Sequence, residues 1–427
     1  MIETPLGPKS GAEAWEDIVA RTEPLEGEPE RDPKSLGTIV YTSGSTGTPK
    51  GVMLSFEAMR IGGEGFAKTL ELTKESRMLS YLPLAHVFER ACVEATSIVV
   101  GFPLYFADSL DTFVEDLRRA RPTAFISVPR LWLKFQAGVF EKMPPKRLDL
   151  LLKIPIINKI IRKKVLEGLG LDQVVVAGTG SAPTPPELIE WYRKLGLMLG
   201  EGYGMSENFS YSHANELDDI RVGYVGKDQP GVTTRISEIG EIEIKSPTAM
   251  MGYYKNEEAT REAFTEDGFF KTGDRGEIDS EGRLRITGRV KEIFKTSKGK
   301  YVSPAPIESE LLTHPLIEQA CVSGSGFPQP FAMIVLTEDA QRRVKGPEKA
   351  EIEAQILAHV DEVNAKLDPH EQLSFVTIVN EQWTIENELL TPTMKLRRSA
   401  VEDRYLGNAE RWAASRQKVI WEEAPAS

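Results

Sequence analysis

Residues 41–51, with the sequence YTSGSTGTPKG, directly follow the run GTIV and combine three glycines with five Ser or Thr side chains and one lysine. Glycine lets successive backbone N–H groups turn toward one point, and hydroxyl groups add further donors. Lys50 supplies a positive charge suited to a polyphosphate. The pattern predicts a phosphate-binding loop, and the alternative is a solvated hairpin turn, because the same residue types are common in turns. The predicted donors are Thr42, Ser43, Gly44, Ser45, Thr46, Gly47 and Lys50.

Four further side chains could take part in chemistry, although each also has an ordinary structural explanation. His86 lies in the apolar segment PLAHVF, where a lone histidine is commonly a hydrogen-bonded core residue. Glu207 in GYGMSE reads as a surface acid, and Asp274 in KTGDRG as a turn aspartate before glycine. Lys395 in LTPTMKLRR reads as a solvated charge. The residues alone leave both explanations open.

The composition argues against several broad classes of function. The chain has 52 basic and 64 acidic residues and a net charge of −12, so it has no basic excess for broad nucleic-acid binding. No Gly-Lys-Ser/Thr triplet occurs, which disfavours a P-loop NTPase. Cys92 and Cys321 are the only cysteines and lie far apart, which favours a reducing, cytoplasmic location. The start of the chain lacks the pattern of a signal peptide.

The order of apolar and helical patterns predicts an α/β fold in several parts. Apolar runs alternate with helical stretches over 37–222, which is typical of a mainly parallel α/β sheet. Short strands and frequent turns over 223–288 predict an antiparallel β-rich module. Two strands, a long amphipathic helix at about 347–367 and a further strand predict a compact α+β domain. We therefore expect a linker or remnant at 1–36, a domain at 37–288, a hinge at 289–292 and a small C-terminal domain at 293–427.

Two apolar segments bear on contact with a membrane. Residues 96–107, TSIVVGFPLYFA, are too short to span a bilayer and predict a buried strand pair. Residues 146–164, KRLDLLLKIPIINKIIRKK, carry seven basic residues and one acidic residue within an acidic protein. This segment is either a helical hairpin with its apolar side on the core or a surface that contacts an anionic bilayer peripherally.

The phosphate-loop stretch YTSGSTGTPKGVMLS resembles the signature of the AMP-forming adenylating superfamily, which includes acyl-CoA synthetases, peptide-synthetase adenylation domains and luciferases. The resemblance runs from about Gly37 to Tyr405 and follows the family's order of motifs. It implies a mainly parallel α/β nucleotide-binding domain with a β-rich module, followed by a small mobile C-terminal domain. The further matching segments are YLPLAHVFER, GTGSAPTPPEL, GEGYGMSE, GYVGKDQPGV, GFFKTGDRGEID, GRVKEIFKTSKGKYVSPAPIE and ENELLTPTMKLRR.

The resemblance implies that the chain binds ATP and Mg²⁺. The loop around Lys50 would hold the β- and γ-phosphates, and Glu207 and Thr46 would contact the metal ion. Ser206 stands where threonine is common in the family, which retains the hydroxyl group. Tyr203 would stack on adenine, with the backbone of residues 180–183 opposite. The implied nucleotide-site residues are Gly180, Ser181, Ala182, Tyr203, Gly204, Ser206, Asp274 as the ribose acceptor, and Arg289 as a ribose or phosphate contact.

The resemblance also implies two steps that share one site. Lys395 would bridge the acyl carboxylate and the α-phosphate during adenylation, and His86 would lie beside the acyl carboxylate. The C-terminal domain would then swing about the hinge and present KTSKGKY to the pantetheine arm of CoA, the co-substrate. Gly299 is the candidate for that contact, because a residue without Cβ lets a thiol channel pass close to the backbone. A hairpin-turn glycine is equally compatible with the sequence.

The C-terminal motifs look most like those of long-chain fatty-acid–CoA ligases. The implied reaction forms acyl-AMP with release of pyrophosphate, and then acyl-CoA and AMP. Family members usually carry a sizeable N-terminal subdomain, whereas about forty residues precede Tyr41 here, which would leave an apolar surface exposed. The alternatives are a truncated or inactive nucleotide-binding fragment and an adenylating enzyme for a different acid or thiol acceptor. A homo-oligomer or a complementing N-terminal fragment would be the matching protein partners.

Overall fold

The computed structural model describes residues 2–3, 11, 13–27, 30–42, 49–109, 111–391 and 395–423. The chain divides into two compact units, Met1–Ser35 and Leu36–Ser427. The first unit contains β1 (Ile2–Glu3), β2 (Glu13–Ala14) and the helix α1 (Trp15–Arg21). Acidic residues in the first turn of α1 and Arg21 in its last turn favour the helix dipole. No residue of α1 is buried, so this unit has little apolar core.

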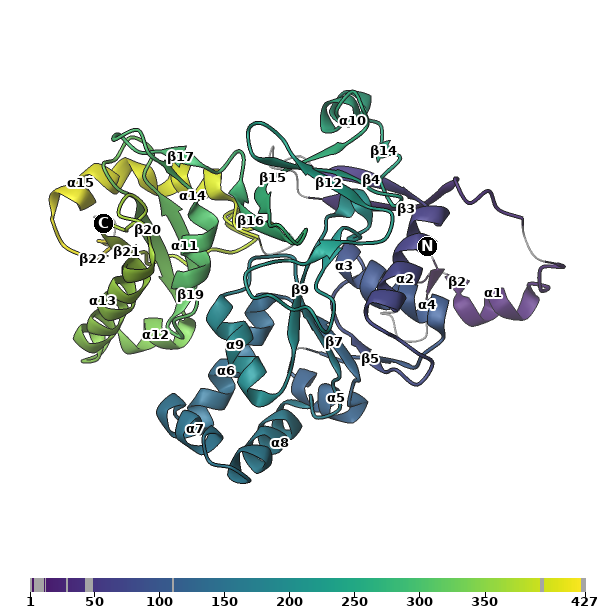
Figure 1. The fold of residues 1–427 in the computed structure, drawn as a ribbon, viewed down its shortest axis with the longest axis horizontal. Coiled ribbons are helices and arrows are strands. Elements are labelled where there is room, and N and C mark those ends of the chain that lie inside the picture. Colours follow the sequence, from purple (N-terminus) through teal and green to yellow (C-terminus); the bar gives the residue numbers. More distant parts are fainter. Residues whose placement is uncertain are drawn as a thin grey trace. The chain divides into compact units, whose positions relative to one another are not determined.

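The second unit begins with an antiparallel hairpin that encloses the predicted phosphate-binding loop. Strand β3 (Leu36–Thr42) pairs with β4 (Lys50–Ser55), and β4 pairs on its other side with β14 (Gly252–Tyr253). The helix α2 (Phe56–Thr69) follows β4 without a break, because the Ser55 side chain caps it by accepting a hydrogen bond from the Ala58 N–H. Figure 1 shows these elements in the upper part of the second unit.

Residues 96–107 do not form the buried strand pair that their apolar character predicted. The chain is helical through α3 (Val87–Glu89), the π-helical segment η1 (Arg90–Ala95) and α4 (Thr96–Val100), and Gly101 then ends the helix in a left-handed conformation. Only β6 (Leu104–Phe106) is a strand, and it pairs in parallel with β5 (Met78–Ser80). The prediction failed because a short apolar run does not distinguish a strand from a continued helix. Within the described residues, no helix has the length and apolarity to cross a bilayer.

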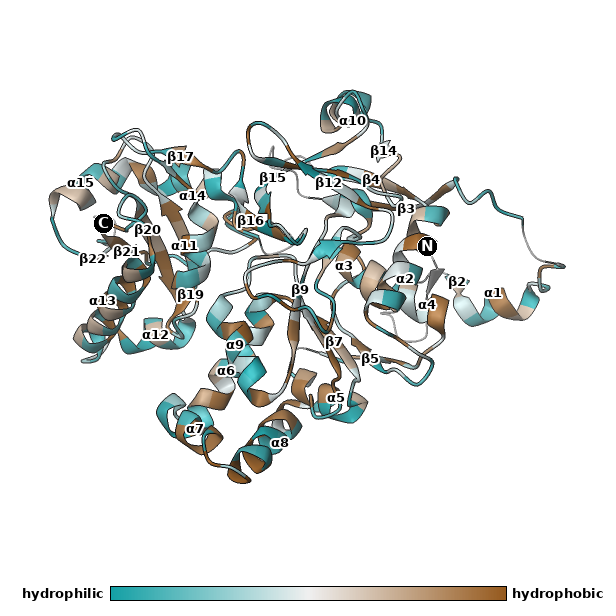
Figure 2. Cartoon of the chain, viewed as in Figure 1, coloured by the Kyte–Doolittle hydropathy of each residue, from teal (hydrophilic) through white to brown (hydrophobic). Residues whose placement is uncertain are grey.

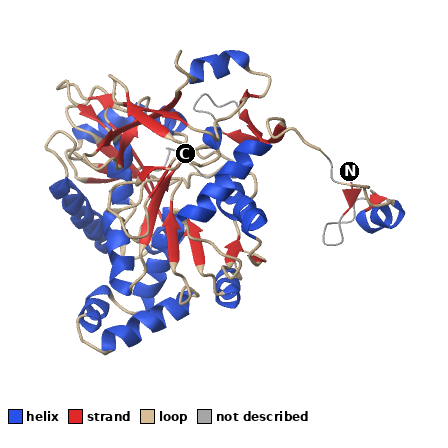
Figure 3. Ribbon diagram, turned by 45° about the vertical axis from the view of Figure 1, so that its right-hand side comes forward, coloured by secondary structure: helices blue, strands red, loops and turns tan. Residues whose placement is uncertain are grey.

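The central sheet of five strands carries the parallel part of the fold. Its order is β11–β10–β9–β8–β7, and β7, β8 and β9 run parallel. Strand β7 is buried along its whole length, as expected for a strand covered on both faces. Figure 3 shows helices beside these strands, and Figure 2 shows that these helices carry both hydrophobic and hydrophilic residues. The bounds are β7 (Ala124–Ser127), β8 (Val176–Thr179), β9 (Leu199–Tyr203), β10 (His213–Ala214), β11 (Lys227–Asp228), α5 (Phe113–Ala120), α6 (Pro129–Lys142), α7 (Pro145–Leu152), α8 (Ile157–Leu169), α9 (Pro186–Leu195) and η2 (Ser206–Asn208).

The β-rich part is an antiparallel sheet with the order β12–β13–β15–β16. The turn-rich pattern of residues 223–288 predicted this arrangement, and the mixed α/β class of the whole fold is confirmed. The strands are β12 (Thr233–Ile236), β13 (Glu241–Lys245), β15 (Phe270–Ile278) and β16 (Leu284–Arg289), and the helix α10 (Glu257–Ala263) precedes β15.

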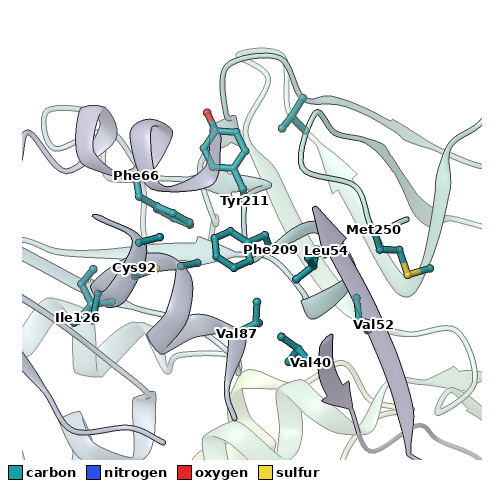
Figure 4. Close-up of a cluster of buried hydrophobic side chains, with 14 of the residues drawn as sticks. Val40, Val52, Leu54, Phe66, Val87, Cys92, Ile126, Phe209, Tyr211 and Met250 are labelled. Atoms are coloured by element: carbon teal, nitrogen blue, oxygen red, sulfur yellow. The ribbon is translucent and has the colours of Figure 1, made fainter. Parts of the chain in front are cut away.

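One buried cluster joins the hairpin, α2 and the antiparallel sheet. Val40 and Leu54 come from the hairpin, Phe66 from α2, and Phe209 and Tyr211 from the segment after η2 (Figure 4). Phe66 and Tyr211 meet edge to face with ring centroids 5.6 Å apart. This packing fixes the base of the hairpin relative to the strand ends that carry the candidate site.

The C-terminal part is an α+β unit around the sheet β19–β20–β21–β22. Its long helix buries Ile352, Ile356, Val360 and Val363, which recur at helical spacing on one face. The bounds are β17 (Phe294–Lys295), β18 (Tyr301–Val302), α11 (Pro304–Leu311), β19 (Ile317–Ser323), β20 (Phe331–Leu336), α12 (Glu338–Arg343), α13 (Lys349–Lys366), β21 (Val376–Ile378), α14 (Arg398–Tyr405), η3 (Leu406–Asn408), α15 (Ala409–Ala414) and β22 (Val419–Trp421).

Candidate active site

Tyr203, Asp274 and Arg289 form a connected polar cluster. The Tyr203 hydroxyl donates to Asp274 Oδ2 at 2.6 Å, and Arg289 Nε lies 3.1 Å from Asp274 Oδ1. Strand pairing produces this arrangement, because Asp274 on β15 lies opposite Arg289 on β16, while Tyr203 is the last residue of β9. The structure therefore brings together three residues that are 71 and 15 positions apart in sequence.

The environment of this cluster is partly dehydrated. Removal from water raises the pKa of Asp274, and the Arg289 charge, the Tyr203 hydrogen bond and the Lys395 charge act against that shift. Removal from water also raises the pKa of Tyr203 well above its ordinary value, and the Asp274 carboxylate adds to the effect. Tyr203 therefore stays a neutral phenol that donates to Asp274.

The segment after β8 approaches β9 too closely for most side chains. A Cβ on Gly180 would lie 3.0 Å from the Gly202 carbonyl oxygen, so glycine permits the backbones to come together. Ser181 has a positive φ of 69°, and Ala182 follows before α9 begins. The backbone of Gly204 likewise packs against that of Ser210, with no room for a Cβ. These contacts place residues 180–182 beside the strand that ends in Tyr203.

Tyr253 connects the two sequence segments predicted to handle phosphate and metal. Its hydroxyl donates to Glu207 Oε1 at 2.9 Å, and Lys50 Nζ lies 4.9 Å from the centroid of its ring. Glu207 lies in η2, directly after Ser206, and Lys50 begins β4. Burial raises the pKa of Tyr253, and the neighbouring Glu207 carboxylate raises it further. One aromatic side chain thus contacts Lys50 through its ring and Glu207 through its hydroxyl group.

The ends of the predicted phosphate-binding loop are fixed by the hairpin. Thr42 pairs with Lys50 in the β3–β4 register, so the two ends of the loop lie side by side. Most of the predicted phosphate donors in this loop lie outside the described residues. These are Ser43, Gly44, Ser45, Thr46 and Gly47.

Lys395 lies within electrostatic reach of this site although it comes from the C-terminal part of the chain. Its ammonium group acts on Asp274 and on His86, and both Asp274 and Glu207 act on it. The surrounding protein lowers the pKa of Lys395 mainly by desolvation, even though the side chain keeps contact with solvent. Desolvation also lowers the pKa of His86, and the Lys395 charge adds to that shift. The Lys395 charge therefore acts on residues from two separate segments of the chain, His86 and Asp274.

Several contacts position the segment that carries Lys395. The Lys395 N–H donates to Thr391 Oγ1 at 3.0 Å, and Leu390 and Leu396 form an antiparallel bridge. Directly afterwards, Arg398 binds Glu308 of α11 through two hydrogen bonds of 2.7 and 2.8 Å. Arg398 also donates to the Val322 carbonyl at 2.8 Å. These bonds anchor the segment to the sheet of the C-terminal part.

Two ion pairs join the C-terminal part to the central sheet region. Lys366 at the end of α13 lies 2.5 Å from Glu187 of α9, and Arg130 of α6 pairs with Glu318 of β19. They accompany the arrangement in which Lys395 faces Asp274. Gly299 lies in the turn of the β17–β18 hairpin, where a Cβ would meet only the Lys295 side chain, at 3.8 Å. The geometry of Gly299 is therefore that of a turn glycine.

The donor set at Glu207 fits a magnesium ion. Oε1 accepts the Tyr253 hydrogen bond, whereas Oε2 accepts no hydrogen bond from a described residue. A carboxylate oxygen with a free lone pair is a ligand that Mg²⁺ prefers. Lys50 contacts the ring of the same Tyr253. The phosphate oxygens that Lys50 would bind are therefore the natural further ligands of the Mg²⁺ ion.

The sequence did not single out Tyr253, Glu89 or the pair His213 and Asp228. Glu89 is buried and accepts from Ser80 Oγ at 2.6 Å, and burial raises the pKa of its carboxyl to about 7. His213 Nε2 lies 2.9 Å from Asp228, and its ring lies 6.0 Å from that of Tyr203. The only local signal was the aromatic pair in MGYYK, since these contacts join residues far apart in sequence.

The fold defines an α/β protein of the adenylation-domain type with a small C-terminal part. The chain belongs to the AMP-binding enzyme family. Residues 4–254 match the AMP-binding enzyme domain, and residues 291–412 match the AMP-binding enzyme C-terminal domain.

Curated relatives are longer than this chain. The long-chain-fatty-acid–CoA ligase FadD15 of Mycobacterium tuberculosis is 34% identical over 417 residues, which cover 87% of this chain and 68% of that protein. The peroxisomal long chain acyl-CoA synthetase 6 of Arabidopsis thaliana is 31% identical over 422 residues, which cover 87% of this chain and 60% of the relative. The chain thus spans about three fifths to two thirds of their lengths.

Solved structures of similar fold are adenylation domains. The adenylation domain of a carboxylate reductase from Mycobacterium chelonae superposes with a TM-score of 0.77 at 28% identity, covering 94% of this chain and 64% of that one. The corresponding domain from Segniliparus rugosus, in complex with AMP and a co-purified carboxylic acid, gives 0.76 at 26% identity, covering 95% and 66%.

Proposed function

We propose that the chain activates a carboxylic acid with ATP, and that the acid is a long-chain fatty acid. The observation that carries the proposal is the position of Lys395, whose charge acts on Asp274 and His86 and is acted on by Glu207. The proposal is supported by family membership and by the ligase relatives described above. Transfer of the acyl group to CoA is the proposed second step.

The proposed first step exchanges one bond to phosphorus for another. A carboxylate oxygen of the acid attacks the α-phosphorus of ATP, and the bond from the α-phosphorus to the bridging oxygen breaks, so pyrophosphate leaves and acyl-AMP remains. In the second step the CoA sulfur attacks the acyl carbonyl, loses its proton and displaces AMP. Negative charge accumulates near the α-phosphate in the first step, so a positioned ammonium group favours it.

The residues then take separate roles. Asp274 accepts from the ribose hydroxyl groups beside Arg289, and Tyr203 with residues 180–182 bounds the adenine. Lys50 and the loop 42–47 bind the terminal phosphates. Glu207 and Thr46 would hold Mg²⁺, which would supply positive charge beside the phosphate groups. Lys395 contacts both the acyl carboxylate and the α-phosphate, and His86 lies beside the carboxylate.

In the proposed mechanism, the second step requires the C-terminal part to change its position. The hinge at 289–292 starts at the last residue of β16 and ends before β17, and the Val290 N–H donates to the Gly273 carbonyl at 2.8 Å. Rotation of 293–427 about this hinge withdraws Lys395 and breaks the Lys366 and Arg130 ion pairs described above. Gly299, in an exposed turn, then approaches the pantetheine arm.

Acid-dependent exchange of labelled pyrophosphate into ATP tests the first step, and AMP release with and without CoA tests the second. A panel of saturated acids of increasing length defines the substrate. We expect exchange to require the acid and AMP release to rise on addition of CoA. ATP binding without exchange with any acid would overturn the proposal.

A second candidate function is nucleotide binding without turnover. The observation that favours it is an exposed apolar surface at the edge strand β6 and at α4, where Ile98 and Phe106 are 77% and 72% exposed. In longer relatives additional chain is available to cover such a surface, and a complementing fragment or a second copy would do the same here. ATP binding without exchange by the chain alone supports this candidate, and exchange that appears only after such a fragment is added would show that the chain is one part of an active enzyme.

Tyr253→Phe should weaken the response to Mg²⁺. Loss of the hydroxyl leaves the Glu207 carboxylate without the hydrogen bond that orients it, so we expect the Mg²⁺ concentration for half-maximal exchange to rise about tenfold. Tyr254→Phe is the matched control, because Tyr254 is the exposed neighbour and contacts Lys255 instead. A rise of the same size in both variants would show that Tyr253 does not orient Glu207.

A further inference from the structure

The α7–α8 hairpin is a basic and apolar projection on an acidic protein. Residues 146–164 carry seven basic side chains and one acidic side chain, whereas the whole chain has a net charge of −12. The helices α7 and α8 pack against each other, and α8 also contacts α5 and α9. The helical hairpin predicted as one alternative for this segment is therefore present.

Packing on the core explains only half of the apolar side chains in this hairpin. The inner side chains belong to the cluster around Trp132 and Tyr192. The outer side chains do not belong to this cluster, although exposed apolar side chains are rarely grouped together on a soluble protein. The inner set comprises Leu148, Leu152, Ile161, Val165, Leu166 and Leu169, and the outer set comprises Leu150, Ile154, Ile156, Ile157 and Ile160.

The outer set gathers at the turn between the two helices. Ile156 is 76% exposed, Leu150 63% and Ile160 50%. Figure 2 shows the junction of α7 and α8 in brown, with hydrophilic residues on the flanks of the helices. We call Ile154, Pro155, Ile156 and Ile157 the apolar tip.

The backbone of the apolar tip holds an isoleucine in an unfavourable conformation. Ile156 has φ 73° and ψ −52°, and the Ile157 N–H donates to the Pro155 carbonyl at 2.9 Å. This is a γ-turn with a positive central φ, a conformation that is strained for a residue other than glycine. Local stability therefore favours glycine, and the exposed isoleucine makes no compensating contact with the core.

The basic side chains beside the tip are mostly free of acidic partners. Within the described part of the chain, five of these basic side chains form no ion pair with a carboxylate, whereas Lys163 lies 3.7 Å from Glu167. The only acidic residue of the segment, Asp149, faces Lys194 at 3.8 Å. The unpaired set is Lys146, Arg147, Lys153, Lys159 and Lys164.

We propose that the apolar tip inserts shallowly into an anionic bilayer while the surrounding lysine and arginine side chains bind lipid headgroups. An acidic protein partner would explain the charges, but a tip of three exposed isoleucines on a two-helix projection suits penetration of the headgroup region better than a flat protein surface. A long-chain acid partitions into the same bilayer, so docking would place the proposed enzyme beside its substrate. The binding itself does not rest on the proposed function, because its test needs neither acid nor ATP.

Flotation with lipid vesicles tests the proposal on the full chain. Vesicles of phosphatidylcholine alone are compared with vesicles that also contain phosphatidylglycerol, and we expect flotation only with the anionic lipid and a decrease with salt. Lys153→Gln with Lys159→Gln and Lys164→Gln should lower vesicle affinity about a hundredfold, at about fivefold for each charge. Ile156→Gly should lower it about tenfold, and it relieves the positive φ, so misfolding does not explain the loss.

A matched control alters equally exposed residues elsewhere. Ile239→Ser with Lys418→Gln removes an isoleucine that is 61% exposed and an exposed lysine outside the hairpin, and flotation should match the parent. The proposal is overturned if the parent does not float with anionic vesicles, or if it floats equally with neutral ones. Binding that depends on the lysines but not on Ile156 also overturns it, because the charged surface would then bind the headgroups without insertion of the apolar tip.

Discussion

Lys395→Ala should lower acid-dependent pyrophosphate exchange about a hundredfold or more, because in the proposed mechanism its ammonium group lies where negative charge develops during attack on the α-phosphorus. Desolvation lowers the pKa of Lys395, and the nearby Asp274 and Glu207 carboxylates oppose that shift, so the group is held among the charges of the site. ATP affinity should change by less than about threefold, because an interaction made mainly in the transition state affects the rate more than binding. Exchange rates and titration calorimetry with Mg·ATP measure the two quantities.

Arg397→Ala is the matched control for that variant. Arg397 lies two positions further along the same segment, with its nearest acidic partner Glu388 at 3.9 Å. It should retain exchange within about threefold, since weak surface ion pairs contribute little. Exchange by Lys395→Ala at the parent rate would remove Lys395 from the proposed mechanism. Loss of ATP binding in the same variant would move its role from the reaction to nucleotide binding.

The glycine-rich loop and its surroundings show what a local pattern can predict. The strand before the loop and the helix from about Ser55 were predictable, because their apolar spacing and the Ser55 cap are encoded within a few residues. The intervening strand β4 was missed. Its partners β3 and β14 stabilise it, and β14 lies about two hundred positions away in sequence.

The candidate site shows what a local sequence pattern cannot predict. Asp274, Arg289 and Tyr203 could be proposed from motifs, but the hydrogen bond that joins Tyr203 to Asp274 depends on how two sheets meet. The role of Tyr253 could not be predicted for the same reason, since its partners Glu207 and Lys50 come from different elements. Residue types could be assigned one by one, whereas their contacts required the fold.

Arg398→Met should destabilise the chain by about 3 kcal/mol, because it leaves the Glu308 carboxylate largely buried without its partner. Desolvation acts to lower the pKa of Arg398, but the Glu308 carboxylate outweighs it and the pKa is raised. Desolvation raises the pKa of Glu308, and the Arg398 charge opposes that shift. Urea unfolding of the parent and the variant measures the difference. Glu308→Leu combined with Arg398→Met should recover most of the loss, since two apolar side chains leave no unpaired charge.

Arg398→Met should slow the first half-reaction more than the second. Arg398 anchors the segment that presents Lys395, so Arg398→Met should slow exchange about tenfold or more under conditions where it is folded. Transfer from supplied acyl-AMP to CoA does not use Lys395 in the proposed mechanism, so it should stay within about threefold of the parent. Equal losses in both half-reactions would reduce Arg398 to a purely structural residue. A selective loss that persists in the double variant would show that the anchor itself, beyond its contribution to stability, places the ammonium group for adenylation.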